Sequence, residues 1–486
     1  MNYELFVPLH SIMWMIAIIL GYFAVLFAIS RLTARRATND TFFRGNRQSP
    51  WYMVAFGMVG ASISGVTFVS VPGMVTSIDM TYMQTCLGFI FGYIAVAFIL
   101  LPLYYRLNLT TIYSYLGKRM GQRAYKTGAS FFLLSKMIGA VVRFYVVCMI
   151  LQQFVFDSMG VPFVLTVSGM VALIWLYTRG GGIKTLVWTD TFQTTCLFTA
   201  LLLIIYKVVG QLGMTIPEAI SAIAADEHSR MFVMDDWVSK QNFWKQFLSG
   251  VFIVIVMTGL DQDMMQKNLT CKSLREAQKD MCTYGVAFVP ANLLFLSLGV
   301  LLVMLGESGV SDSLLPGFVE RSGLSVLVPF TIGIVAASFS SADSALTSLT
   351  TSYCVDIRGR AGDEQLRKRA HMMISILFVV MILLFRLLNS TSVIDAIYTI
   401  CGYTYGPLLG LFAFGMLTHR MPRDRFVPYI CIASPLVCYA IDAITWHLVG
   451  YRFGYELLMM NGALTFWALL AVSSPKTPLA ECQTVS

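Results

Sequence analysis

Long apolar runs, separated by short polar segments, cover almost the whole chain. Most runs have about 20 residues, the length that a helix needs to cross the roughly 30 Å hydrocarbon core of a bilayer. The runs do not alternate apolar and polar residues, as the strands of a membrane barrel do, so the pattern predicts helices. The chain divides into about thirteen predicted spans, near residues 7–30, 51–77, 84–105, 128–156, 161–178, 187–211, 243–265, 281–306, 325–355, 371–388, 393–418, 426–447 and 455–473.

The composition agrees with an integral membrane protein. Of the 486 residues, 57% are hydrophobic and 12% are charged, whereas soluble domains carry about 25% charged residues. The ten cysteines stand singly, with no CxxC pair, which argues against a zinc site or a disulfide framework. Basic connections between spans explain the net charge of +8, so we expect membrane lipid around the chain and no nucleic-acid partner.

Basic residues are concentrated in the first connection between spans and in every second connection after it. Positive residues mark the cytoplasmic side of a membrane. The alternation therefore predicts an odd number of spans, with the N-terminus outside and the C-terminus in the cytoplasm. No eukaryotic targeting signal is evident, so we expect a bacterial inner membrane. The first connection contains Arg31, Arg35, Arg36, Arg44 and Arg47, and the basic connection after the seventh span contains Lys267, Lys272, Arg275 and Lys279.

The ninth predicted span carries a row of polar residues at membrane depth. At about 100° per residue, the row forms one face of a helix. Close packing against a neighbouring helix would explain the serines alone, but a carboxylate in a span is a candidate for function. Oxygen ligands at these spacings, beside a negative charge, suit a small hard cation such as sodium. The residues on this face or next to it are Ala337, Ser340, Ser341, Asp343 and Ser344.

Two spans contain sequences that break helices. The second span has Gly57, Gly60 and Gly65 among hydroxyl residues. Glycine lets the backbone leave helical geometry and frees carbonyls for a cation or solute, although close packing of small residues is the alternative. The seventh span ends in TGLDQD, and we expect Asp261 and Asp263 to form a solvated cap at its cytoplasmic end.

The spacing of the two broken spans predicts an internal repeat. Each broken span opens a block of five, at residues 51–211 and 243–418. Five is an odd number, so the second block has inverted topology relative to the first. Such inverted repeats place binding sites at discontinuous helices near the midplane. We expect one transporter domain, with an extra N-terminal helix at 7–30 and two C-terminal helices at 426–473.

Further polar residues lie inside other spans. Asp190 begins the sixth span, where it could meet Ser340, Asp343 and Ser344, or simply favour the helix dipole. Arg143 lies deep in the fourth span and needs a partner there, which could be Asp343, backbone carbonyls or an anionic solute.

Three other residues of the spans have weaker interpretations. Lys136 lies nearer the cytoplasm than Arg143 and could extend its ammonium to the membrane surface. Tyr403 and Tyr405 lie just before a predicted kink at Pro407 and would suit a gate over a polar solute. Core packing is the more common use of tyrosine.

Together these segments resemble the sodium:solute symporter family, which includes bacterial proline, sugar and sialic-acid transporters. The resemblance covers nearly the whole chain. It implies a LeuT-like fold, in which an inverted five-plus-five repeat carries one extra N-terminal helix and further C-terminal helices. The motifs that carry it are FFRGNRQSPW at 42–51, SGVTFVSVPG at 64–73, YTRGGGIKTLVWTD at 177–190, DQDMMQK at 261–267 and ASFSSADSALTS at 337–348.

The resemblance also implies which residues bind sodium, with one or two ions per transporter. Members usually carry a hydroxyl residue where this chain has Asp343, and the extra carboxylate could tighten a site, titrate with protons or pair with Arg143. The main sodium site maps to Gly60, Ile63, Ala337, Ser340 and Ser341. A second sodium site, closer to the cytoplasm, maps to Asp190, Ser340, Asp343 and Ser344.

The solute is less closely defined. Ser62, Ser64 and Thr67 match positions that contact the substrate in sialic-acid relatives. The arginine that binds the solute carboxylate there aligns nearer Ala140, about one turn before Arg143. We expect sodium-coupled symport of a small polar solute, such as a sugar, a sialic acid or a related sugar acid, by a functional monomer. The alternatives are proton-coupled symport, because of Asp343, and sodium-coupled uptake of an amino acid or another carboxylate.

Other classes of function fit the sequence poorly. An intramembrane serine protease needs a Ser–His pair, but the five histidines lie toward span ends or in loops, and no GxSxG elbow is present. Asp190 and Asp343 could form an acid pair, but no protease motif surrounds either. Broken helices do not suggest the continuous pore of a channel. We therefore expect no catalytic residues and no enzyme.

Overall fold

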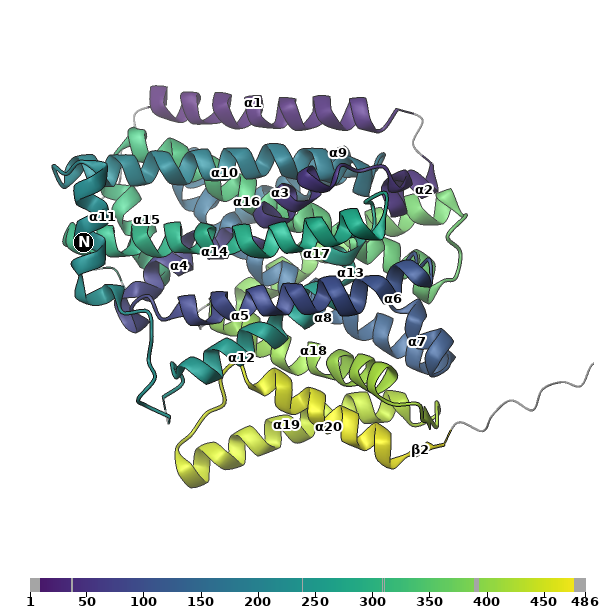
Figure 1. The fold of residues 1–486 in the computed structure, drawn as a ribbon. Helices are drawn as coiled ribbons and strands as arrows, with labels where there is room; N and C mark the ends of the chain where they lie inside the picture. The colour runs from purple at the N-terminus through teal and green to yellow at the C-terminus, as the bar shows by residue number, and fades with distance from the viewer. Residues whose placement is uncertain are drawn as a thin grey trace, which may run out of the picture.

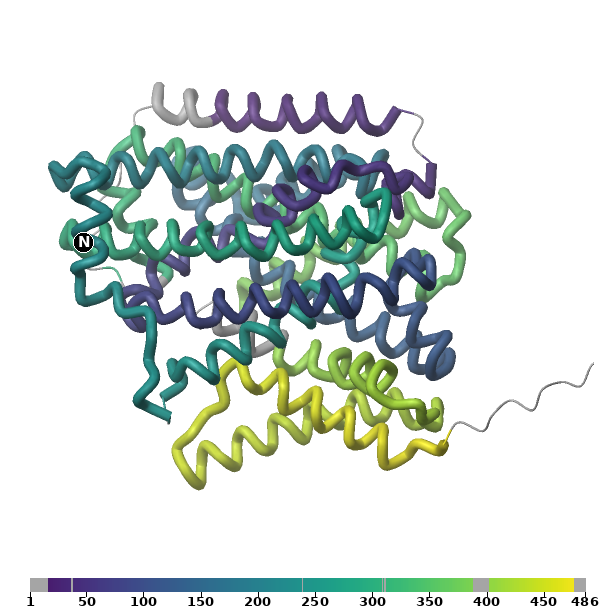
Figure 2. Tube along the Cα trace, in the orientation of Figure 1, coloured from purple at the N-terminus to yellow at the C-terminus, as the bar shows by residue number. Residues whose placement is uncertain are grey.

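The computed structural model describes residues 9–35, 38–237, 239–307, 309, 311–388 and 393–475. Helices form nearly all of this part, and they lie side by side in one bundle (Figure 1). Helix α1 lies along one edge of the bundle, and α19 and α20 lie along the opposite edge (Figure 2). The named strands of the described part are a short antiparallel pair, β1 (Met421–Pro422) and β2 (Ser473–Ser474).

Most helices follow one another with short connections, and a longer one joins α11 to α12. In chain order they are α1 (Leu9–Thr33), α2 (Asn39–Arg44), α3 (Trp51–Ser62), α4 (Gly65–Ile78), α5 (Tyr82–Ala95), α6 (Leu101–Arg106), α7 (Ser114–Arg119), α8 (Gln122–Leu151), α9 (Phe163–Thr178), α10 (Ile183–Gln211), α11 (Ile216–Ala225), α12 (Phe243–Val254), α13 (Gln262–Asn268), α14 (Leu274–Met304), α15 (Leu314–Arg321), α16 (Leu324–Ser352), α17 (Glu364–Leu388), α18 (Val393–Leu417), α19 (Val427–Val449) and α20 (Leu457–Ala471).

Most predicted spans correspond to helices of membrane-spanning length. Within the described residues, eight helices are long and apolar enough to cross a bilayer, or up to ten if each of two bent helix pairs is one span. Helices also occupy the predicted spans at 161–178, 393–418 and 455–473. Two of these helices have fewer than 18 residues, and the third, α18, is not among the candidate spans of the described residues, so the count of thirteen stays a prediction.

Both predicted breaks are present. Helices α3 and α4 meet at 62°, and the segment Phe243–Gly259 meets α13 at 70°. At the first break, Ile63 and Ser64 leave helical geometry. At the second, the helix passes through a π-helical turn at Ile255–Gly259 and then ends.

The glycines beside the first break serve the packing role that the sequence suggested. A Cβ atom on Gly60 would lie 1.9 Å from Thr194 Oγ1 of α10, and one on Gly65 would lie 2.1 Å from Ser338 Oγ of α16. Any larger residue would overlap these neighbours. Close packing of small residues thus holds the broken span between α10 and α16, and the two interpretations are compatible.

Candidate functional site

The polar face of α16 packs against α10, as the sequence predicted for Asp190. The Ser340 hydroxyl donates a 2.7 Å hydrogen bond to Asp190 Oδ1. Asp343 accepts a 2.6 Å hydrogen bond from the Tyr177 hydroxyl and a 3.3 Å bond from the Ser344 hydroxyl. All four residues of the predicted second sodium site therefore lie in one buried cluster.

This cluster also contains a lysine that the sequence placed in a cytoplasmic loop. Lys267 of α13 is 1% exposed, and its Nζ atom lies 2.8 Å from Asp190 Oδ2. The contact is an ion pair without hydrogen-bond geometry, and no described residue is a hydrogen-bond partner of the ammonium. The loop assignment was wrong because α13 turns back into the bundle after the 70° bend.

The predicted main sodium site lies where the first break faces α16. The backbone N–H of Ser64 donates to the Ser62 carbonyl, not to that of Gly60, so the Gly60 carbonyl leaves the helical pattern. Ile63 is fully buried beside it, and Ala337 and Ser340 are buried on α16. The Ser341 hydroxyl donates to the Ser338 carbonyl at 3.0 Å. The carbonyls of an unwound turn, facing hydroxyl groups, form an environment that suits sodium.

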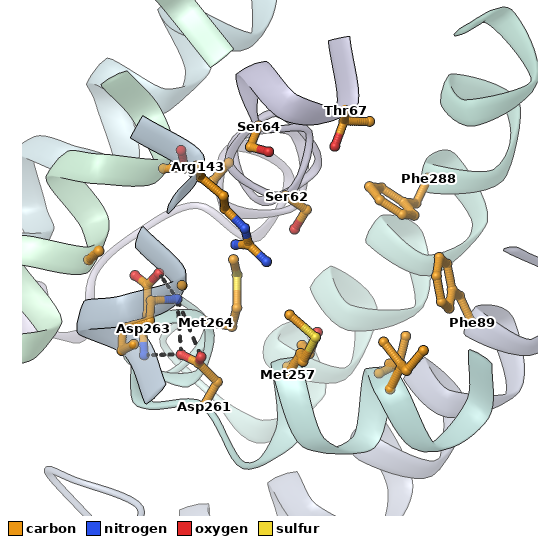
Figure 3. A pocket seen from close by; sticks show the side chains of 18 of the residues that line it. Ser62, Ser64, Thr67, Phe89, Arg143, Met257, Asp261, Asp263, Met264 and Phe288 are labelled. Carbon is orange, nitrogen blue, oxygen red and sulfur yellow. Dashed lines mark hydrogen bonds and ion pairs between the residues drawn. The ribbon is translucent and has the colours of Figure 1, made fainter. Parts of the chain in front are cut away.

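A cavity adjoins this region, with about 1100 Å³ of space between protein atoms, part of it open solvent. Figure 3 shows Ser62, Ser64 and Thr67 on one side of it and Phe89 and Phe288 on another. Ser341 of the predicted main sodium site lines the same cavity. The chain thus brings its predicted solute residues next to its predicted sodium residues.

Arg143 of α8 extends its guanidinium into this cavity (Figure 3). No hydrogen bond or ion pair joins it to any other described residue. Asp343, one of its three expected partners, bonds instead to Tyr177 and Ser344. A half-buried guanidinium without a protein partner is a costly arrangement, and an anionic solute in the cavity would compensate it.

A second charged group forms the polar wall of the cavity. Lys136 Nζ lies 2.6 Å from Asp263 Oδ2 and 3.3 Å from Asp261 Oδ2. All three side chains are buried. The expected solvated cap and surface-reaching lysine were therefore wrong. The bend after α12 turns both carboxylates inward, where Lys136 balances their charge.

The two tyrosines proposed as a gate lie in different places. Tyr405 is buried at the cavity, and its hydroxyl donates a 2.6 Å hydrogen bond to Asp261 Oδ2. Tyr403 is not among the residues that line the cavity, and its ring lies 6.2 Å from that of Tyr439 on α19. Of these two tyrosines, Tyr405 alone lines the cavity.

Sequence reasoning missed three residues of the site: Lys267, Tyr177 and Tyr284. The Tyr284 hydroxyl hydrogen-bonds to Ser62 at the cavity. Lys267 and Tyr177 lie inside motifs that the sequence singled out, DQDMMQK and YTRGGGIKTLVWTD. A buried carboxylate requires a partner, so Asp190 and Asp343 were the signals that could have directed attention to them.

Comparison with known proteins gives a consistent result. Residues 42–424 match the model of the sodium:solute symporter family. A sodium/sialic acid symporter of Proteus mirabilis is 24% identical over 449 residues, covering 86% of this chain and 87% of the relative. A second, from Aliivibrio fischeri, is 24% identical over 474 residues, covering 92% and 91%.

A solved structure confirms the expected LeuT-like fold. The substrate-bound, outward-open structure of a Na⁺-coupled sialic acid symporter matches with a TM-score of 0.79 at 20% sequence identity. The match covers 94% of this chain and 97% of that one. At this identity the likeness concerns the fold alone.

Proposed function

This chain belongs to the sodium:solute symporter family, and from that premise we propose that it imports a sialic acid or a related sugar acid together with sodium. It is an integral membrane protein and a secondary active transporter, not an enzyme, and its substrates are sodium and a small polar solute. The observation that carries the choice of solute is the unpaired Arg143 guanidinium in the cavity.

The chemistry of the cavity supports an acidic, hydroxylated solute. A guanidinium binds a carboxylate through two parallel hydrogen bonds. The hydroxyls of Ser62, Ser64 and Thr67 can donate to and accept from sugar hydroxyls. The aromatic rings of Phe89 and Phe288 offer an apolar surface to the rest of the molecule. A neutral sugar would leave the guanidinium without a partner.

The sodium sites in this proposal keep the residues expected from the family. The main ion would bind the carbonyls of Gly60, Ile63 and Ala337 and the hydroxyls of Ser340 and Ser341. The released Gly60 carbonyl and the cavity-lining Ser341 support this assignment. Asp190, Ser340, Asp343 and Ser344 would form a second cation position.

The proposal also includes the architecture around these sites. Residues 51–211 and 243–418 would form the inverted repeats, with the N-terminus outside and the C-terminus in the cytoplasm of a bacterial inner membrane. One chain, surrounded by lipid, would be the functional unit. Tyr405 would take part in gating, since it joins α18 to Asp261 at the cavity wall.

Thermal stability of the detergent-purified protein tests the solute and the coupling ion together. Ligands that bind the folded state raise the melting temperature by mass action. We expect N-acetylneuraminic acid to raise it in sodium but not in choline. A shift that ignores sodium and follows pH would instead support proton coupling, which the buried Asp343 carboxylate favours. A shift with amino acids or simple carboxylates alone would replace the sugar acid as solute.

The variant Arg143→Ala tests whether the Arg143 guanidinium binds the acidic group of the solute. Losing hydrogen bonds to a charged group costs about 1.5–3 kcal/mol, so we expect binding of N-acetylneuraminic acid to weaken roughly 10- to 150-fold. The melting temperature without ligand should stay near that of the wild type, because no described residue bonds to Arg143. Arg143→Lys keeps the positive charge but not the planar guanidinium that makes two parallel hydrogen bonds, so it should restore binding only in part. Equal losses for acidic and neutral solutes would refute the assignment.

A further inference from the structure

We propose that the Lys267 ammonium is the resident cation of the second cation position, so that one sodium ion moves with each solute. The inference rests on the proposed function, because it assumes sodium symport through the main site. It makes Lys267 the residue that sets the number of sodium ions per transport cycle.

The first argument is the way Asp190 is occupied. Its Oδ2 atom lies 2.8 Å from Lys267 Nζ, and its Oδ1 atom accepts the 2.7 Å hydrogen bond from Ser340. Both oxygens of the carboxylate are thus engaged by the protein itself. Asp190 and Lys267 are each 1% exposed, so water does not take the place of either partner.

The second argument is that Asp343 is occupied in the same way. Its Oδ2 atom accepts from Tyr177 and its Oδ1 atom from Ser344. Three of the four carboxylate oxygens at this position therefore accept a hydrogen bond, and the fourth, Asp190 Oδ2, is ion-paired with Lys267. A sodium ion bound to Asp190 would lie at contact distance from the ammonium, and two cations repel strongly in a medium of low dielectric constant.

The third argument is that α13 holds Lys267 in place. This helix is buried along its length and follows the 70° bend. A covalently attached cation can neutralise Asp190 but cannot dissociate into the cytoplasm. The pair therefore gives the charge balance that a second sodium would give, without adding a transported charge.

The proposal predicts electroneutral transport. N-acetylneuraminic acid carries one negative charge and would move with one sodium ion, so the wild-type protein in proteoliposomes should generate no net current. The ratio of labelled sodium to labelled solute should be one. A ratio of two with a net inward current would overturn the proposal, whether or not any variant folds.

The variant Lys267→Met tests the residue directly. It leaves Asp190 and Asp343 without a resident cation, so we expect the flux ratio to double and a current to appear. Lys267→Arg keeps a cation, and Lys267→Met with Asp190→Asn removes both charges, so these two should retain a ratio of one. Lys272→Met, which removes an exposed lysine of the next loop, is the matched control and should behave as the wild type.

Each further outcome has one meaning. A folded Lys267→Met protein that still moves one sodium per solute would overturn the role of Lys267. If that variant fails to fold, the ratio of sodium to solute transported by the wild-type protein decides whether the proposal holds. Absence of sodium-dependent uptake in the wild type would instead refute the proposed function, and the inference with it.

Discussion

The two broken spans both interrupt a helix inside the bundle, but the residues at the two breaks differ in their chemistry. The break between α3 and α4 is neutral: glycines let the backbone approach α10 and α16, and the chain offers carbonyls. The break between α12 and α13 is charged. Asp261 caps α13 by accepting a 2.8 Å hydrogen bond from the Asp263 backbone N–H, and both carboxylates point inward.

The difference shows what each kind of break requires from the rest of the fold. Carbonyls carry only partial charges, so a cation that binds and dissociates is a sufficient partner for them. Carboxylates carry full charges, which are not stable in the interior without a permanent partner. Lys136 of α8 supplies that partner at the second break, while Lys267 of α13 extends away to Asp190.

The largest effect should follow from removing the partner of the charged break. Lys136→Met leaves Asp261 and Asp263 buried without a counter-charge. Breaking a buried ion pair costs about 3–5 kcal/mol, so the melting temperature in detergent should fall sharply.

A second substitution separates charge from packing at this break. Asp263→Asn, added to Lys136→Met, should recover part of the lost stability because one unpaired charge disappears. Lys126→Met, at an exposed position of the same helix, should change little. If Lys136→Met were as stable as the wild type, the ion pairs of Lys136 with Asp261 and Asp263 would not stabilise the charged break.

A smaller effect should follow from enlarging a residue of the neutral break. Gly60→Ala places a methyl group 1.9 Å from Thr194 Oγ1 and 2.7 Å from its Cβ. Overpacking costs about 1–3 kcal/mol, and the shifted backbone should also raise the sodium concentration that gives half-maximal uptake. Adding Thr194→Ala to Gly60→Ala should relieve the clash in part. Unchanged sodium activation in a destabilised Gly60→Ala protein would remove Gly60 from the main site.

The sequence predicted the parts of this fold that depend on local patterns. Span lengths follow from apolar runs, and the first break follows from glycines among hydroxyl residues. The meeting of Asp190 with Ser340 could be expected because both lie on polar faces inside spans. Each prediction needed only residues close together in the chain or a motif of the family.

The charge partners could not be predicted in this way. Lys136 and Asp261 are 125 residues apart, and Tyr177 and Asp343 are 166 residues apart. A lysine near a span end has the same local pattern whether it reaches the membrane surface or an interior carboxylate. For Lys267 the deciding feature was the direction of the chain after the bend, which no pattern of apolar residues specifies.

The smallest effect should come from the hydrogen bond that links α18 to the charged break. Tyr405→Phe removes the bond to Asp261 but keeps the ring. Because Lys136 still balances the carboxylate, we expect a loss near that of a typical hydrogen bond, about 0.5–1.5 kcal/mol. If Tyr405 takes part in gating, the uptake rate should change more than the melting temperature. Tyr403→Phe, outside the cavity lining, should change neither. A loss of stability alone would make Tyr405 a structural partner of Asp261, and the charged break would then hold α18 in place without controlling access to the solute.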